Sequence, residues 1–375
     1  MGGIGGIGGI GGSGGIGGIG GIGGIGGIGG GTVTGLGSFY APTVADPTLA
    51  QGLVTSGAAI MHVAGPEDAG ETAHGAYDEL ARGPAAHLAS YESWVRASLY
   101  LTDFLRDLQW TSRPDGVEIG FRTCAGDGLI ATIKRPPVDL LRRQLELVRS
   151  YMDQRADRLV EIVTQVGFPT DYFGSILGLT QARNPKTFEL IAITQVLAAH
   201  VAMVAKHALA CRRPDRLSAS VTPMLPTPGH PTFPSAHATE AFAVAVVLEG
   251  LVKDPKIATF YPIKERTVDL LYKLAERIAV NRTVAGVHFP VDTWAGAALG
   301  EALGQLILAR CRPGGTVTPR SFEAEDIDFR IDQFRETPST AGKYGLTRPS
   351  AAAVSYETSA LFVWLWGEAT AEYAL

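Results

Sequence analysis

The chain has 375 residues, of which 46% are apolar and 18% charged, and it carries a formal net charge of −5. Its length and composition predict a globular body with a well-filled core, while the negative charge excludes a general electrostatic attraction to nucleic acid or to anionic membranes. Any anion site must therefore depend on local basic clusters, and three widely spaced cysteines argue against a disulfide framework or a zinc site.

Residues 1–31 repeat the triplet GGI, with Ser13 in one of the isoleucine positions. Low-complexity glycine is typical of a flexible linker. A period of three also matches a polyproline-II-like helix, which would place every isoleucine on one edge. Such a rod cannot satisfy its own amides, so it would become ordered only beside copies of itself or another partner. We therefore expect either a linker or an arm for self-association into a homo-oligomer or filament.

The first residues lack the basic segment, leucine-rich core and cleavage site of a secretory signal. The most apolar stretch, residues 188–210, contains Glu189, Gln195, His200 and Lys206, which suits a core helix better than a lipid-facing one. We expect a soluble protein without a transmembrane segment, either cytoplasmic or exported to the cell surface by a route that needs no signal peptide.

From about residue 40 onward, apolar residues recur at spacings of three and four, which is typical of helices. The pattern predicts helices over residues 92–108, 136–167, 187–211, 236–252, 264–280 and 291–311. Residues 118–124 and 128–133 alternate in a way that predicts one small hairpin. The predicted fold class is all-α, a helical bundle over residues 32–312. Residues 313–375 are expected to dock on this body, where they could cover a site or contact a neighbouring chain.

The first candidate cluster is Lys206 and Arg213, followed by Pro214. Residues seven apart lie two turns apart on one face of a helix, so both cationic groups can reach the same point. Two basic residues near a helix end also occur simply because they interact favourably with the helix dipole. The pair alone is compatible with either interpretation.

The second cluster lies in PTFPSAHATE, residues 231–240, directly before an uncharged apolar run. Pro234 and Ser235 are common at helix starts, and His237 could be an ordinary surface side chain. The same segment could instead hold an anion, because the first N–H groups of a helix have no intrahelical partner and the macrodipole favours negative charge there.

The third cluster is Asn281 and Arg282, followed by His288 and Asp292, with Pro290 placed to start the last long helix. Asp292 follows His288 by four residues, close enough to accept the ring N–H and fix the tautomer. A loop histidine beside an acidic helix cap gives the same pattern without any catalytic role.

Taken together, the three clusters resemble the signature K-x6-RP, PSGH and SR-x5-H-x3-D of vanadium-dependent haloperoxidases and of acid and lipid phosphatases of the PAP2 type. The resemblance covers residues 206–292. Two positions differ: Ala236 replaces a glycine and Asn281 replaces a serine. Alanine keeps the backbone donor but adds a methyl group near the anion.

The resemblance implies a site for one tetrahedral oxyanion, vanadate as cofactor or phosphate as substrate. It implies that vanadate or phosphate is bound by the side chains or amides of Lys206, Arg213, Ser235, Ala236 and Arg282. It also implies three catalytic residues: His288 as the vanadium ligand or nucleophile, Asp292 behind it, and His237 as acid–base partner.

Both chemistries of the family fit these motifs. The segment around His237 resembles the haloperoxidase form, and His230 stands where bromide-oxidising members carry a histidine, although it is also plausible as a simple loop residue. GVHFPVD resembles the phosphatase form equally well. We expect a vanadate-dependent haloperoxidase that oxidises bromide or iodide with hydrogen peroxide, with two alternatives: an acid phosphatase that acts through a phosphohistidine at His288, and a filament subunit built on an enzyme fold.

Overall fold

The computed structural model describes most of the chain beyond residue 84, together with a few residues before it. The described residues are 51–56, 58–59, 83, 85–123, 126–257, 259–336, 342–349 and 353–374. The predicted GGI arm and its self-association lie outside these residues.

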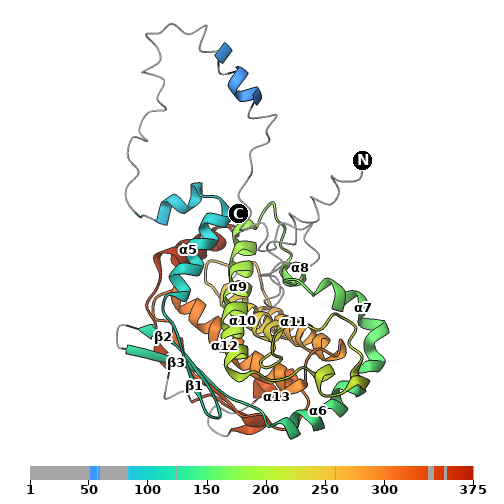
Figure 1. Ribbon diagram of the computed structural model, residues 1–375. Helices are drawn as coiled ribbons and strands as arrows, with labels where there is room; N and C mark the ends of the chain where they lie inside the picture. The colour runs from blue at the N-terminus through green and yellow to red at the C-terminus, as the bar shows by residue number, and fades with distance from the viewer. Residues whose placement is uncertain are drawn as a thin grey trace, which may run out of the picture.

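Four long helices make up the centre of the protein (Figure 1). They are α9 (Pro185–Leu209), α10 (Ala236–Val252), α11 (Lys264–Val284) and α12 (Pro290–Cys311). Helices α9, α10 and α12 are apolar around most of their circumference and are buried accordingly. The predicted bounds of α10 are correct, and the predictions for α9, α11 and α12 are correct to within a few residues.

Close packing of α10 on α12 depends on glycines of α12 at intervals of four residues. A Cβ atom on Gly296 would lie 2.5 Å from the backbone oxygen of Ser235, and one on Gly300 would lie 2.4 Å from that of Thr239. Residues spaced by four lie on one face of a helix. These glycines therefore let the start of α10 approach the start of α12, which brings the second and third sequence clusters together.

We expect Gly300→Ala to destabilise the protein by about 1–3 kcal/mol, because the new methyl group forces α10 and α12 apart. Gly367→Ala in the C-terminal helix is the matched control, since a Cβ atom there meets no atom within 4 Å. Thermal denaturation should show a lower midpoint for the first variant and an unchanged or higher one for the second. Equal midpoints would contradict the packing argument.

The prediction of an all-α fold is wrong in one respect, since a five-stranded sheet covers part of the helical body. Its strand order is β1-β2-β3-β5-β6, with strands β1 (Leu108–Arg113), β2 (Gly116–Thr123), β3 (Gly126–Lys134), β5 (Arg320–Phe322) and β6 (Leu346–Thr347). The predicted hairpin corresponds to β2 and β3. Val117, Ile119 and Phe121 alternate into the core from β2, which explains why the sheet remains on the body.

Shorter helices surround the central four. They are η2 (Ala85–Ser90), α5 (Ser93–Leu105), α6 (Val138–Ser150), η3 (Tyr151–Gln154), α7 (Arg155–Thr164), α8 (Thr170–Leu177), η4 (Pro214–Arg216) and η5 (Ala219–Val221). The single helix predicted over residues 136–167 is therefore wrong: η3 tightens the backbone and separates α6 from α7. This break lets the end of α7 reach the start of α10.

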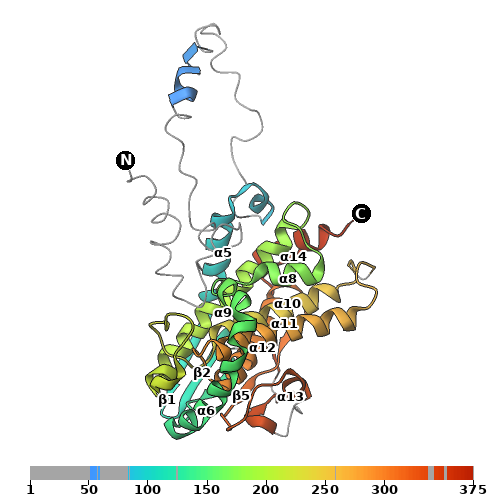
Figure 2. The same cartoon turned by 90° about the vertical axis from the view of Figure 1, so that its right-hand side faces the viewer.

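The C-terminal extension contacts the body at several points. It contains β4 (Thr316–Val317), α13 (Ile331–Glu336), η6 (Lys343–Gly345), β7 (Val354–Ser355) and α14 (Ala360–Ala371), besides β5 and β6. Strand β5 pairs in parallel with β3, and the Glu372 carboxylate accepts hydrogen bonds from the backbone N–H groups of Lys186 and Thr187 at the start of α9. In Figure 2, α14 and α8 lie toward one end of the helical body, and α6 and α13 toward the other.

Among the described residues, one segment, Pro185–Arg216, is long and apolar enough to cross a membrane, and 83% of its most apolar window is buried inside the protein. A core helix of a soluble protein has the same properties. The expectation of a soluble body without a transmembrane segment therefore stays a prediction.

Candidate active site

Lys206 and Arg213 both hold the loop that precedes α10. Lys206 lies on the last turn of α9, where its Nζ donates to the backbone oxygens of Pro231 at 2.9 Å and Thr232 at 2.6 Å. The prediction that Arg213 shares a helix face with Lys206 is wrong, because α9 ends at Leu209 and Arg213 lies in extended backbone before η4. Arg213 donates from Nε to the backbone oxygen of His230 at 3.1 Å. Burial lowers the pKa of Arg213 to about 10, and burial together with the charge of Arg213 lowers the pKa of Lys206 well below its ordinary value.

The start of α10 supplies backbone donors. Ser235 is the residue before the helix, and its hydroxyl oxygen accepts from the N–H of Ala238 at 3.4 Å, as an N-cap side chain does. Ala236 is the first helical residue, it is buried, and its φ is not positive. Alanine therefore fits the conformation that the family fills with glycine, and its amide remains at the helix N-terminus.

His288 is oriented by hydrogen bonds at both ring nitrogens. Its Nδ1 lies 2.7 Å from Oδ2 of Asp292, and its Nε2 lies 3.0 Å from Nη1 of Arg213. Because a guanidinium can only donate, Nε2 is the acceptor and Nδ1 carries the proton. Burial and the nearby cations lower the pKa of His288 well below its ordinary value, so the ring is neutral with its lone pair on Nε2.

Asp292 is held by several donors at one carboxylate oxygen. Besides His288, the hydroxyl of Thr232 and the N–H of Phe289 donate to Oδ2. Burial raises the pKa of Asp292 to about 6. The backbone oxygen of Asp292 accepts from the N–H of Ser235 at 2.9 Å, which joins the start of α12 directly to the start of α10.

Arg282 and His237 meet at Gln165, the residue that ends α7. Nη2 of Arg282 donates to the backbone oxygen of Ile162 at 3.1 Å and lies 3.4 Å from Oε1 of Gln165. Nε2 of His237 lies 2.9 Å from the backbone oxygen of Gln165. Among the described residues, Nε of Arg282 is buried without a hydrogen-bond partner. Burial lowers the pKa of Arg282 to about 10.

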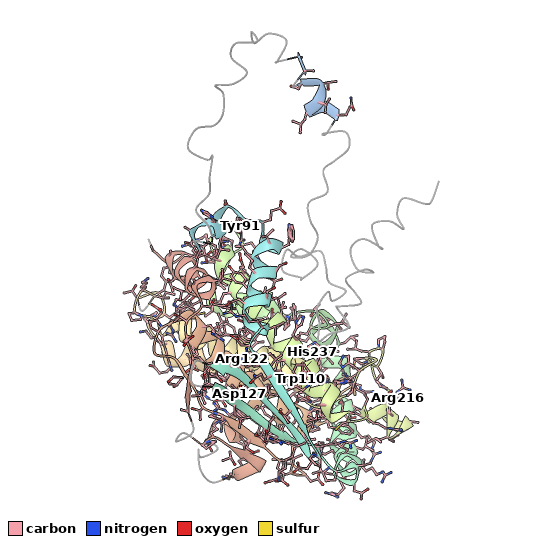
Figure 3. All side chains as sticks on the ribbon, turned by 60° about the vertical axis from the view of Figure 1, so that its left-hand side comes forward. Tyr91, Trp110, Arg122, Asp127, Arg216 and His237 are labelled. Carbon is pink, nitrogen blue, oxygen red and sulfur yellow. The ribbon has the colours of Figure 1, made fainter. Side chains whose placement is uncertain are left out.

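His230 lies against the same arginine as His288. Its Nδ1 is 3.1 Å from Nη2 of Arg213, while Nη1 of that arginine contacts His288. Figure 3 labels His237 within the helical part of the molecule, whereas Trp110, Arg122 and Asp127 lie on the sheet and Arg216 in the short helix η4. The candidate site is thus formed by helix ends and loops, without a contribution from those three sheet residues.

The structure places the predicted residues in one buried region. Arg213 contacts His230 and His288 directly, and Arg282 contacts His237 through Gln165. The charges of Arg282, Lys206 and Arg213 all act on His237, and its pKa is lowered to about 3 by burial first and then by these cations. Within the described residues, every hydrogen bond of the three cations goes to a neutral acceptor.

Sequence reasoning did not identify Thr232, Gln165 or Glu240 as parts of this site. Glu240 is the most unusual of the three, because both carboxylate oxygens are buried and have no hydrogen-bond partner among the described residues. Its spacing of three residues from His237 in the same helix was the one available signal.

A separate cavity of about 510 Å³ lies between η3, α7, α11 and the C-terminal extension. None of the predicted site residues lines it. Arg158 at its wall donates to Oδ1 of Asn281 at 3.2 Å, and Nδ2 of Asn281 donates to Oε1 of Gln165 at 2.9 Å. Asn281 therefore supports the site through Gln165 from this side.

Comparisons with known proteins agree with the motifs. The family model of the PAP2 superfamily matches residues 188–312. The decaprenylphosphoryl-5-phosphoribose phosphatases of two Mycobacterium tuberculosis strains, CDC 1551 / Oshkosh and H37Rv, are each 31% identical to the chain over 134 residues, which is 36% of this chain and 67% of each relative.

Two solved structures show weaker similarity. A bacterial vanadium-dependent iodoperoxidase is 17% identical with a TM-score of 0.34, over 44% of this chain and 47% of that one. A transmembrane PAP2-type phosphatidylglycerolphosphate phosphatase from Bacillus subtilis is 21% identical with a TM-score of 0.29, over 45% of this chain and 92% of that one. The chain thus spans about half the length of the iodoperoxidase. The match of the family model and the extent of the mycobacterial relatives' similarity show that the chain belongs to the PAP2 superfamily.

Proposed function

We propose that this protein hydrolyses phosphate monoesters through a phosphohistidine at His288. The observation that carries the proposal is the set of three buried cations, Lys206, Arg213 and Arg282, whose hydrogen bonds within the described residues all go to neutral groups. Burying cations without an ion pair is costly unless an anion compensates them. Asp292 and Glu240 act on these cations through their charge, but the cations donate no hydrogen bond to either acid within the described residues. A phosphoryl group between these side chains would supply that charge.

The other donors suit the same anion. The amide of Ala236 and the hydroxyl of Ser235 lie at the N-terminus of α10, where negative charge is favoured. Nη1 of Arg213 donates a hydrogen bond to the lone pair of His288 Nε2 in this structure. For catalysis, the guanidinium must turn from the histidine to the bound phosphoryl oxygens, which frees Nε2 for attack.

The proposed reaction has two steps. Nε2 of His288 attacks phosphorus and the P–O bond to the alcohol breaks, while protonated His237 donates its proton to the leaving oxygen. Water then attacks the phosphohistidine, and His237 takes a proton from that water as phosphate is released. Burial, and after it the nearby cations, lower the pKa of His237 to about 3. The negative charge of a bound phosphate raises this pKa.

The mycobacterial relatives support this choice, because both are named as phosphatases and each is 31% identical to the chain over 134 residues. The vanadate-dependent haloperoxidase, which the motifs alone favoured, is the second candidate. The contact of His230 with Arg213 beside His288 supports it, since it places a further imidazole next to the anion site.

The residues that suit phosphate also suit vanadate, another tetrahedral oxyanion, with His288 as the protein ligand to vanadium. When bound, vanadate would supply activation of hydrogen peroxide for the oxidation of bromide or iodide. In this reaction, Lys206, Arg213 and Arg282 would bind the anion and His237 would hold or release a proton beside it.

The assembly function proposed for residues 1–31 does not compete with either activity, and electron microscopy of the full chain and of a chain without residues 2–31 would test it.

The two chemistries can be separated with one preparation of the full-length protein. We expect hydrolysis of p-nitrophenyl phosphate that orthovanadate inhibits, and a ³²P-labelled enzyme whose label is stable to alkali and labile to acid, as N-linked phosphate is. Monochlorodimedone bromination with peroxide and added orthovanadate should be absent. Bromination without phosphatase activity would put the haloperoxidase first, and a label with the opposite stability would place the nucleophile on a residue other than histidine.

A further inference from the structure

One acidic side chain in the candidate site has no role in the proposed reaction. Glu240 lies on α10, one turn after His237, and is 1% exposed. Within the part of the chain that the structure describes, neither carboxylate oxygen has a hydrogen-bond partner, and both are buried. A buried carboxyl group without a partner is costly, so its retention calls for an explanation beyond packing.

Glu240 faces the anion-binding cations from α10. Its carboxyl group interacts with the charges of Lys206 on α9 and Arg282 on α11. Nε of Arg282 is likewise buried and has no partner in the described ranges, so a donor and two acceptors without partners there lie in the same region. Side chains of helices lean toward the helix N-terminus, which directs Glu240 toward the first turn of α10, where the oxyanion is proposed to bind.

We propose that Glu240 makes the binding of the oxyanion depend on pH. Its carboxyl group adjoins the anion and must hold a proton when a fully deprotonated oxyanion is bound. The affinity for the oxyanion therefore rises as the pH falls. This inference rests on the proposed oxyanion site. An ionised carboxylate beside the ligand repels it, whereas a protonated one removes the repulsion and adds an O–H donor.

Burial, rather than the surrounding charges, favours proton uptake by the Glu240 carboxyl group. Burial raises the pKa of Glu240 well above its ordinary value, against the opposing effects of Lys206 and Arg282. Asp292 on α12 is the second buried acid of the site and acts on the same lysine. Substituting Glu240 alone therefore separates its contribution to the pH dependence from that of Asp292.

Sulfate is the appropriate probe, because it stays a dianion across the working pH range and cannot bring a proton of its own. We expect Glu240→Gln, which keeps the shape and a donor but cannot ionise, to bind sulfate about as tightly as the wild type at pH 5 and at least about tenfold more tightly at pH 8. Isothermal titration calorimetry of the full-length protein at each pH measures this ratio. Glu249→Gln is the matched control on the same helix, since Glu249 pairs with Lys253 and Tyr272 at its far end.

The outcomes are distinct. A ratio that grows with pH for Glu240→Gln, with Glu249→Gln behaving as the wild type, supports the proposal. A ratio that is constant across the pH range, even if different from one, assigns Glu240 a structural role and overturns it. If neither the wild type nor Glu249→Gln binds sulfate or phosphate at any pH, the proposed oxyanion site itself fails.

Discussion

His288→Ala is expected to lower kcat for phosphate ester hydrolysis by about 10⁴–10⁶-fold, because it removes the nucleophile rather than a supporting group. The structure gives His288 the features that this role needs. Its Nδ1 proton is directed to Asp292 and its Nε2 lone pair faces Arg213. No label should be trapped on the variant in the ³²P experiment.

Binding should survive where catalysis does not. Lys206, Arg213 and Arg282 remain in His288→Ala, so its affinity for sulfate should stay within about tenfold of the wild type. His207→Ala is the matched control, since that histidine is exposed on α9 directly beside Lys206. An activity within a hundredfold of the wild type, with the label still trapped, would place the nucleophile elsewhere.

The parts of the fold that were predictable are those with a strong local signal. The bounds of α10 follow from Pro234 and Ser235 at its start and from an apolar run that continues to Val252. Strand β5 has three residues and exists because it pairs with β3, nearly two hundred positions away in the chain. Such a strand has no periodicity of its own, so the sheet could not be predicted beyond the hairpin.

The residues of the candidate site likewise include some that the sequence could identify and others that it could not. Lys206, Arg213, Arg282 and His288 could be identified because the three clusters together resemble a family signature, although each cluster alone fitted an ordinary interpretation as well. Glu240 could not, because its role depends on helices α9 and α11 bringing two cations against α10. Gln165 acts partly through its backbone oxygen, which any residue type supplies, so no sequence pattern marks it.

Asp292→Asn is expected to lower kcat by about 10²–10³-fold with little change in KM, because it removes the charge behind His288 but keeps the shape. Oδ2 accepts from His288, Thr232 and Phe289. An asparagine oxygen can take that position and leave the NH₂ group at the place of Oδ1 of Asp292, which has no partner among the residues that the structure describes. The ring should therefore keep its tautomer while the negative charge that stabilises the cationic phosphohistidine is lost.

Asp292→Ala should impair both activity and stability more than Asp292→Asn does. It leaves three buried donors without an acceptor, and no group remains to orient the ring of His288. Its activity should fall below that of Asp292→Asn, and its thermal midpoint should fall as well.

Asp254→Asn is the matched control, because Asp254 is also a buried aspartate and lies away from the site. It accepts hydrogen bonds from Trp366 and from the backbone of Lys256. That variant should lose stability and keep its kcat. If Asp292→Asn retains kcat within threefold of the wild type, the charge of Asp292 is not needed in the transition state, and the carboxylate serves only to hold the histidine in place.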